Sequence, residues 1–291
     1  MHLDEILRIA NPKQLAAIKH PLSPLMIIAG AGTGKTFTLE NRIIYMIQKY
    51  GVKPDSILTI TYTEKAAKEL KSRLYEKIGQ KVHPMFVGTF HSFCYKLMKD
   101  YQINNADSSS LIDHSEAVHM ILENYDDFMP FMSEEFSISP KISVVESFIP
   151  FFNRLRDELV DIDKVDQSIL KEFYEDDVES FNQLNDLLRI FPIYQNLKIE
   201  NNLIDYNDMI IDSFNALKND IRLLEKVQLK YEHLIIDEFQ DNNYALNEIS
   251  RLISKKNRSI TVVGDDDQVI YSFRGANAFN ISTFEKTYQS H

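Results

Sequence analysis

A glycine-rich segment near the N-terminus carries the residue types that bind phosphate groups. It reads Ala-Gly-Ala-Gly-Thr-Gly-Lys-Thr. Glycines let the backbone approach a phosphate closely, and successive backbone N–H groups can then point at its oxygens. We expect Lys35 to neutralise the β- and γ-phosphates and the Thr36 hydroxyl to ligate Mg²⁺. The predicted nucleotide contacts are Ala29, Gly30, Ala31, Gly32, Thr33, Gly34, Lys35 and Thr36.

This pattern usually begins with glycine, and Ala29 holds that place here. Alanine is acceptable there if the backbone does not need a positive φ angle. A chance glycine-rich turn is the competing interpretation. An apolar strand before the loop and a helix after it make that alternative a minor one.

Two adjacent acids follow another apolar stretch late in the chain. Residues 234–236 are Leu-Ile-Ile and lead directly into Asp237 and Glu238. Two carboxylates at the end of a buried strand cost free energy unless they serve a cation or a proton. We expect Asp237 to hold Mg²⁺ and Glu238 to orient and deprotonate the attacking water. An acidic loop after a strand is common, so this assignment depends on the phosphate loop being present as well.

The elements that must position these residues alternate between strands and helices. Strands are expected at residues 25–29, 56–62, 86–89, 231–236 and 259–263, and helices at 37–50, 64–78 and 92–101. Apolar and β-branched runs indicate the strands, and apolar positions at helical spacing indicate the helices. Such alternation is typical of a parallel α/β sheet. Residues 102–200 have mainly helical patterns, which predicts an all-α insertion in the α/β domain.

The charge is uneven along the chain. The net charge is -11, which by itself argues against a nucleic-acid binder. Residues 99–200, however, hold 8 basic and 22 acidic residues, so the rest of the chain carries a balance of +3. The acidic middle is typical of a solvated helical surface, and the flanking regions can still contact phosphate.

Composition excludes several protein classes. A single cysteine, Cys94, rules out an intrachain disulfide and fits a reducing cytoplasm. No apolar run approaches the roughly 20 residues that a membrane span needs, and the N-terminus does not resemble a signal peptide. We therefore expect a cytoplasmic protein without a membrane partner.

Several segments, in order, resemble motifs of the superfamily 1A DNA helicases of the UvrD/Rep/PcrA type. They are residues 11–14, 59–67, 88–92, 205–209, 237–241 and 263–276, besides the phosphate loop. The resemblance implies a P-loop NTPase (RecA-like) domain at residues 1–98 and 205–291. It also implies that residues 99–204 form the helical insertion called subdomain 1B.

The resemblance also implies roles for individual residues. Gln14 would read the adenine edge, Arg42 would lie near the nucleotide, and Gln268 would sense the γ-phosphate. The implied DNA contacts are Thr61, Tyr62, Thr63, His91, Tyr271, Phe273 and Arg274. Tyr62 stands where the family usually has phenylalanine, and Phe273 replaces a frequent tryptophan. Each ring can still stack on a base.

The implied activity is an ATP- and Mg²⁺-dependent DNA helicase or single-strand translocase, acting on single-stranded DNA or a duplex junction. No segment resembles the family's second motor domain, so we expect the isolated chain to turn over ATP slowly and not to unwind DNA. Two alternatives stay open: a non-motor, nucleotide-dependent switch or adaptor, and RNA as the substrate.

Overall fold

The computed structural model describes residues 3–30, 32–105, 108–265 and 279–288. Its contacts divide the chain into two compact units, one made of Met1–Leu97 with Ser213–His291 and the other of Met98–Asp212. The sequence placed the second junction between residues 204 and 205. Residues 205–212 belong instead to the helical unit, because Asp205 and Asp208 bind charged side chains within it.

A five-stranded parallel sheet forms the centre of the first unit, in the order β1-β7-β6-β2-β3. Its strands are β1 (Leu25–Ile28), β2 (Ile57–Ile60), β3 (Phe86–Gly88), β6 (His233–Ile236) and β7 (Ser259–Gly264). All residues of β2, β6 and β7 are buried. Helices cover both faces of such a sheet, which explains why these strands are apolar without alternation. The prediction of a parallel α/β sheet flanked by helices is confirmed.

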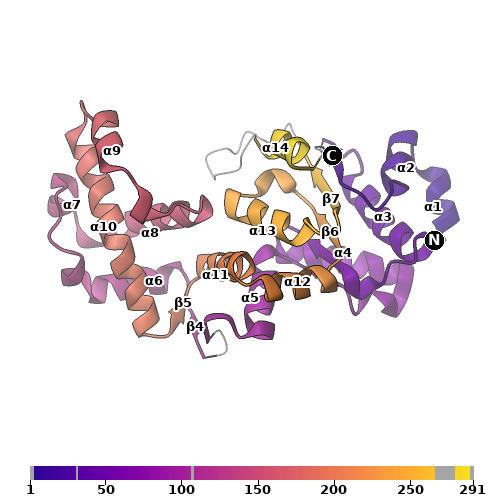
Figure 1. Ribbon diagram of the computed structural model, residues 1–291, viewed down its shortest axis with the longest axis horizontal. Coiled ribbons are helices and arrows are strands. Elements are labelled where there is room, and N and C mark those ends of the chain that lie inside the picture. The colour runs from indigo at the N-terminus through magenta and orange to yellow at the C-terminus, as the bar shows by residue number, and fades with distance from the viewer. Residues whose placement is uncertain (1–2, 31, 106–107, 266–278, 289–291) are drawn as a thin grey trace. The chain divides into compact units, whose positions relative to one another are not determined.

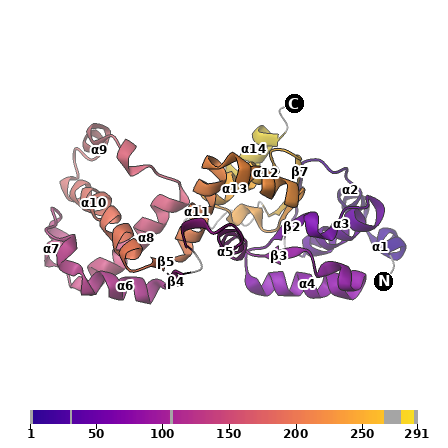
Figure 2. The ribbon, with the colours of Figure 1, turned by 60° about the horizontal axis from the view of Figure 1, so that its bottom comes forward.

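Helices of the first unit pack on both faces of this sheet. They are α1 (Leu3–Ile9), α2 (Pro12–Ile18), α3 (Lys35–Lys49), α4 (Glu64–Ile78), α12 (Ile221–Lys230), α13 (Tyr244–Ser254) and α14 (Phe279–Tyr288). Ile43 of α3 and Leu74 of α4 share a core with Ile235 of β6 and Val263 of β7. Helix α13 contacts β6 and lies across the strands from α3 (Figures 1 and 2).

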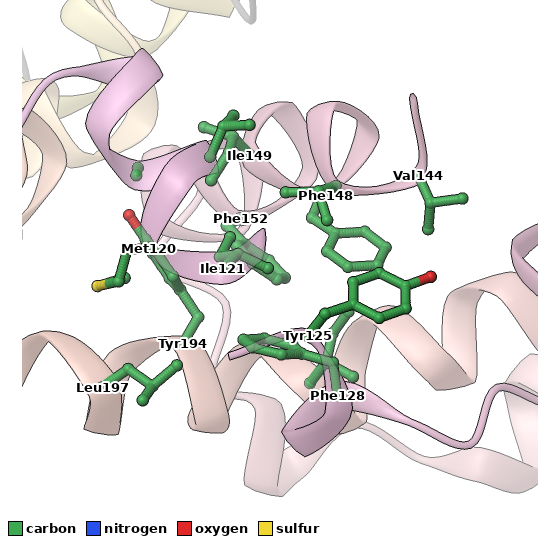
Figure 3. Close-up of a cluster of buried hydrophobic side chains, with 14 of the residues drawn as sticks. Met120, Ile121, Tyr125, Phe128, Val144, Phe148, Ile149, Phe152, Tyr194 and Leu197 are labelled. Atoms are coloured by element: carbon green, nitrogen blue, oxygen red, sulfur yellow. The ribbon is translucent and has the colours of Figure 1, made fainter. Parts of the chain in front are cut away.

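The second unit is helical around an aromatic core. Its helices are α6 (His114–Glu123), α7 (Glu134–Ile138), α8 (Lys141–Asp157), α9 (Gln167–Phe173) and α10 (Val178–Glu200). Helices α5 (Phe90–Tyr101) and α11 (Tyr206–Asn219) each begin in one unit and end in the other. Phe148, Phe152 and Tyr194 are fully buried in this core (Figure 3), with the last two rings stacked at 5.1 Å. One short parallel pair, β4 (Ser110–Leu111) with β5 (Leu203–Ile204), was not predicted.

None of the described helices is both long and apolar enough to cross a membrane.

Candidate nucleotide-binding site

Three neighbouring strands end at the same edge of the sheet, and each is followed by residues with site chemistry. Strand β7 lies between β1 and β6. The Ala29 amide donates to the Gly264 carbonyl at 3.0 Å, and the Asp237 amide donates to the Ile60 carbonyl at 2.9 Å. The carboxyl edge of an open parallel sheet is where ligands usually bind. The topology therefore brings the glycine-rich loop and the acidic pair together.

The glycine-rich loop turns tightly into helix α3. Its Thr33 hydroxyl donates to the Gly30 carbonyl at 2.7 Å, and Gly32 and Gly34 have φ angles of 74° and 90°. A Cβ at Gly34 would lie 2.8 Å from Gln14 Nε2, so Gln14 would have to shift, and the φ angle of 90° by itself favours glycine. The first turn of α3 contains no acidic residue. The amides of this first turn are the groups that we predict to bind phosphate.

Gln14 is tied to this loop. Its Nε2 donates to the Thr33 carbonyl at 3.2 Å, and its Oε1 accepts from the Asn11 amide at 3.1 Å. Asn11 in turn caps the start of α2, which completes a capping box. Gln14 therefore holds the loop through its bond to Thr33. Its contact with adenine stays a prediction.

Lys35 lies between two carboxylates. Its Nζ is 3.4 Å from Glu238 Oε2 and 3.2 Å from Asp265 Oδ2. Burial on its own lowers the pKa of Lys35, but the two carboxylates outweigh burial and raise it. Asp265, at the end of β7, is fully buried and was not predicted as a partner of the lysine. A bound triphosphate must therefore compete with these carboxylates for the lysine.

The acidic pair shares a cavity with the loop threonine. Thr36, Asp237 and Glu238 are among the residues that line this cavity of about 340 Å³. Burial, reinforced by the Glu238 charge, raises the pKa of Asp237 to about 6. Mg²⁺ prefers oxygen ligands, commonly one or two carboxylates together with substrate phosphates. Thr36 and Asp237 supply such oxygens, and the partly buried Asp237 carboxylate gains from a nearby cation, so these residues fit Mg²⁺.

Gln240 connects the acidic pair to the end of β7. Its Nε2 donates to Glu238 Oε2 at 2.8 Å, and its Oε1 accepts from the Asp265 amide at 3.1 Å. A side chain at Gly264 would meet Gln240 Oε1 at 3.2 Å, so the contact is close. Gln240 was not predicted as a site residue, although it belongs to the motif at residues 237–241. Its position identifies it as the residue that orients the Glu238 carboxylate.

Replacing Gln240 with alanine is expected to slow ATP hydrolysis about 10- to 100-fold, since a hydrogen bond to a charged group contributes about 1.5–3 kcal/mol. ATP affinity is expected to change much less, because the Gln240 side chain bonds Glu238 and the Asp265 amide. Single-turnover hydrolysis and titration with a fluorescent ATP analogue measure the two effects. The exposed Gln48 provides a matched Gln→Ala control. Equal loss of affinity and of rate would contradict an orienting role.

Arg42 does not face the predicted nucleotide site. It is fully buried, and its Nε donates to Thr261 Oγ1 at 2.8 Å. Its two terminal nitrogens donate to the carbonyls of Ala17, His20 and Pro21 at 2.8–3.0 Å. Burial lowers its pKa to about 10, so it stays charged at neutral pH. The predicted contact with nucleotide is therefore corrected to a structural role, in which Arg42 joins α3 and β7 to the end of α2 and the residues after it.

The predicted DNA contacts differ in their exposure. Tyr62 is 54% exposed and lines the same cavity as Asp237. Thr63 caps α4 by accepting from the Ala66 amide at 3.1 Å. Thr61 is buried, and its hydroxyl donates to the Thr63 carbonyl at 3.1 Å. Its side chain therefore supports this turn instead of facing a DNA strand.

His91 is half-buried, and burial lowers its pKa, which favours the neutral ring. The remaining predicted residues, Ala31, Gln268, Tyr271, Phe273 and Arg274, lie outside the described residues, and their roles stay predictions.

Comparison with known proteins identifies the family of this chain. Residues 10–289 match the family described as the UvrD/REP helicase N-terminal domain. A probable DNA helicase II homolog from Mycoplasma capricolum is 32% identical over all of this chain and 38% of its own length. The ATP-dependent DNA helicase PcrA of Staphylococcus aureus is 31% identical over 98% of this chain and 37% of its own length. The chain thus spans less than two fifths of these relatives, and it belongs to the UvrD/REP helicase family as its N-terminal, P-loop domain.

Proposed function

We propose that this chain binds MgATP and supplies the hydrolytic site of an ATP-dependent DNA helicase. The observation that carries the proposal is the convergence of Lys35, at the start of α3, with Glu238 and Asp265, which follow the neighbouring strands β6 and β7. Relatives named as ATP-dependent DNA helicases cover the same region. An ATP-driven motor places its triphosphate at such an edge, beside the amides of the first helix.

Each residue of the site has a chemical task in this proposal. The loop amides and Lys35 hold the phosphates, and Thr36 with Asp237 holds Mg²⁺. When bound, the cation offsets negative charge on the transferred phosphoryl group. Glu238 accepts a proton from the attacking water, in the orientation that Gln240 gives it. Once phosphates attract Lys35, Glu238 loses its lysine contact and becomes the more available base.

Tyr62 supports a link between this site and a nucleic-acid strand. Its exposed ring and Glu238 line one cavity, and its segment leaves β2 beside the segment that leaves β6. Aromatic rings stack on bases with little regard to sequence. We propose that Tyr62, with Tyr271, Phe273 and Arg274, contacts single-stranded DNA. We also propose that a second motor domain completes the helicase. A non-motor switch is not favoured, because Asp237, Lys35 and Glu238 supply the residue types that ATP hydrolysis needs.

Adding single-stranded oligonucleotide is expected to accelerate ATP turnover.

Lys35→Ala is expected to weaken ATP binding about 100-fold. The lysine makes charge-assisted contacts with the phosphates, and the loss of about 3 kcal/mol corresponds to that factor. Calorimetric titration with a non-hydrolysable ATP analogue measures the affinity, and phosphate release measures turnover.

Lys256→Ala, at an exposed position, provides the matched control. Circular dichroism checks that the Lys35→Ala chain stays folded, because Lys35 also pairs with the buried Asp265. Unchanged ATP affinity in this variant would contradict the proposed site. If the oligonucleotide has no effect, either on this chain or on a longer form with a second motor domain, the switch becomes the better assignment.

A further inference from the structure

Helix α4 has a basic surface that the ATP site does not use. The helix buries three apolar residues and lies at the outside of the first unit (Figure 2). Lys68, Lys71 and Tyr75 are exposed, and their spacing of three and four residues makes them neighbours on the helix surface. We call these three residues the α4 stripe. It lies beyond residues 59–67, the segment that resembles a helicase motif.

The acids of α4 leave this stripe basic. Glu69 and Glu76 each follow a stripe residue by one position, which turns them about 100° away from it around the helix. Glu64 is four positions before Lys68 and on the same side of the helix. Its Oε1, however, accepts a hydrogen bond from the Thr89 hydroxyl at 2.9 Å.

Basic residues elsewhere on α4 have partners within the protein. Lys77 Nζ lies 2.7 Å from Glu40 Oε1 of α3. Arg73 Nη2 lies 3.9 Å from Glu69 Oε2. Neither stripe lysine forms an ion pair with a residue that the structure describes. The two stripe charges are therefore available to an anion from outside the chain.

Exposed aromatic rings lie at both ends of this surface. Tyr62 is 54% exposed just before α4, and Tyr75 is 49% exposed near its end. The Tyr75 ring packs edge-on against His83, with ring centres 5.7 Å apart. Because a helix rises about 1.5 Å per residue, Lys65 and Tyr75 are about 15 Å apart along α4, which is about four nucleotides at B-form spacing. Proteins that bind single strands combine lysines, which follow the phosphates, with rings that stack on bases.

The composition of this surface favours nucleic acid over a protein as its partner. Among the exposed residues of α4, all of which the structure describes, Tyr75 is the one with a large hydrophobic side chain. Protein interfaces have apolar cores and are depleted in lysine. A polyanion needs no apolar core, because counterions released at each contact between a lysine and a phosphate supply the affinity.

We propose that the α4 stripe binds the phosphate backbone of single-stranded DNA beyond Tyr62, and that the Tyr75 ring stacks on a base. Lys68 and Lys71 pair with phosphates, and Lys65 joins the stripe to Tyr62. This contact rests on the proposed function, in which Tyr62 meets the same strand. It gives that strand a second binding surface, outside the ATP site.

Fluorescence anisotropy of the full chain with a labelled deoxythymidine oligonucleotide tests the stripe. About 20 nucleotides suffice, because single-strand binding folds cover roughly 4–16. The double variant Lys68→Gln/Lys71→Gln is expected to bind about tenfold more weakly. It is also expected to reduce the slope of log affinity against log salt concentration by about 1.4, since each lost phosphate contact removes about 0.7. Lys255→Gln/Lys256→Gln, at exposed positions after α13, is the matched control and is expected to change neither quantity.

Tyr75→Ala is expected to weaken binding about fivefold or more without changing the salt slope, because it removes a stacked base and no phosphate contact. Tyr75→Phe keeps the ring and is expected to bind as the original chain does. Circular dichroism checks that each variant stays folded.

Tyr62→Ala, measured in parallel, separates the stripe from the proposed function. If Tyr62→Ala weakens binding and the double variant matches its lysine control, the stripe is wrong and the contact at Tyr62 stands. If the double variant weakens binding and Tyr62→Ala does not, the stripe is supported and the contact at Tyr62 fails. An unchanged salt slope in the double variant would overturn the stripe. So would equal competition by polyglutamate of the same net charge, which would make an acidic protein the partner.

Discussion

Glu238→Gln is expected to lower the rate constant of ATP hydrolysis by about 10²- to 10⁴-fold, the usual contribution of a general base. Glutamine keeps the size of the side chain and a partner for Gln240, but it cannot take a proton from water. Lys35 loses one of its two carboxylate partners in the variant. ATP affinity is therefore expected to stay the same or to rise, because the phosphates compete with one carboxylate fewer.

Single-turnover hydrolysis and equilibrium titration separate these two effects. Glu225→Gln, at an exposed position of α12, serves as the acid-to-amide control and is expected to hydrolyse ATP normally. If Glu238→Gln hydrolyses ATP at the original rate in a protein that carries the second motor domain, the assignment of the base is wrong. If the rate and the affinity fall together, Glu238 serves binding instead of catalysis.

Local features that oppose stability gather at this site. Glu238 has φ 52° and ψ 47°, a left-handed conformation that costs a residue with a side chain about 1–3 kcal/mol. Beside it, the raised pKa of Asp237 reflects a carboxylate that burial disfavours. Asp265 is a third carboxylate, fully buried near the same lysine. Natural proteins depart from stability rules mainly where function requires it, which supports assigning function to this edge of the sheet.

The parts of the fold that follow from local sequence were predictable. Strands such as β6 and β7 are buried throughout, so each appears in the sequence as a short run of mainly apolar and β-branched residues. Helix α4 begins and ends at the predicted residues, Glu64 and Ile78, because Thr63 caps its first turn and Gly79 follows its last. The loop from Ala29 to Thr36 was recognisable because phosphate binding requires small residues followed by a lysine and a threonine.

The parts that depend on distant contacts were not predictable. Lys35 and Asp265 are 230 residues apart, and only the position of β7 between β1 and β6 makes them neighbours. Arg42 is a charged residue on an apolar helix, and its partners are backbone carbonyls that no side-chain pattern reveals. Gln240 and Asp205 acquire their roles in the same way. Sequence patterns identify which residues carry chemistry, while the tertiary fold decides which of them meet.

Asp205 belongs to a buried ion network that holds the end of the helical unit. Arg156 Nη1 lies 2.8 Å from Asp205 Oδ2 and 3.0 Å from Asp208 Oδ1. Lys198 Nζ lies 2.7 Å from Asp205 Oδ2 and 2.6 Å from Asp208 Oδ2, and the Tyr194 hydroxyl donates to Asp205 at 2.8 Å. Burial alone raises the pKa of Asp205, but the Arg156 and Lys198 charges outweigh it and hold that pKa well below its usual range.

Arg156→Met is expected to destabilise the protein by about 3–5 kcal/mol, because it leaves two buried carboxylates facing a single lysine. Urea unfolding followed by circular dichroism measures the change. Arg154→Met is the control on the same helix. Arg154 pairs with Glu158 at 3.0 Å but is largely exposed, so its loss is expected to cost less than about 1 kcal/mol.

The pH dependence of this difference gives an independent check. A carboxyl whose pKa is depressed by folding stabilises the native state fully above its unfolded pKa and loses that contribution as pH falls below it. The ordinary pKa of Asp205 is 3.8. The difference in the free energy of unfolding between Arg156→Met and the original chain is therefore expected to stay constant from neutral pH to about 5. It is expected to shrink below about pH 4. A gap that stays constant in acid would mean that Arg156 stabilises the unit through packing and not through its charge.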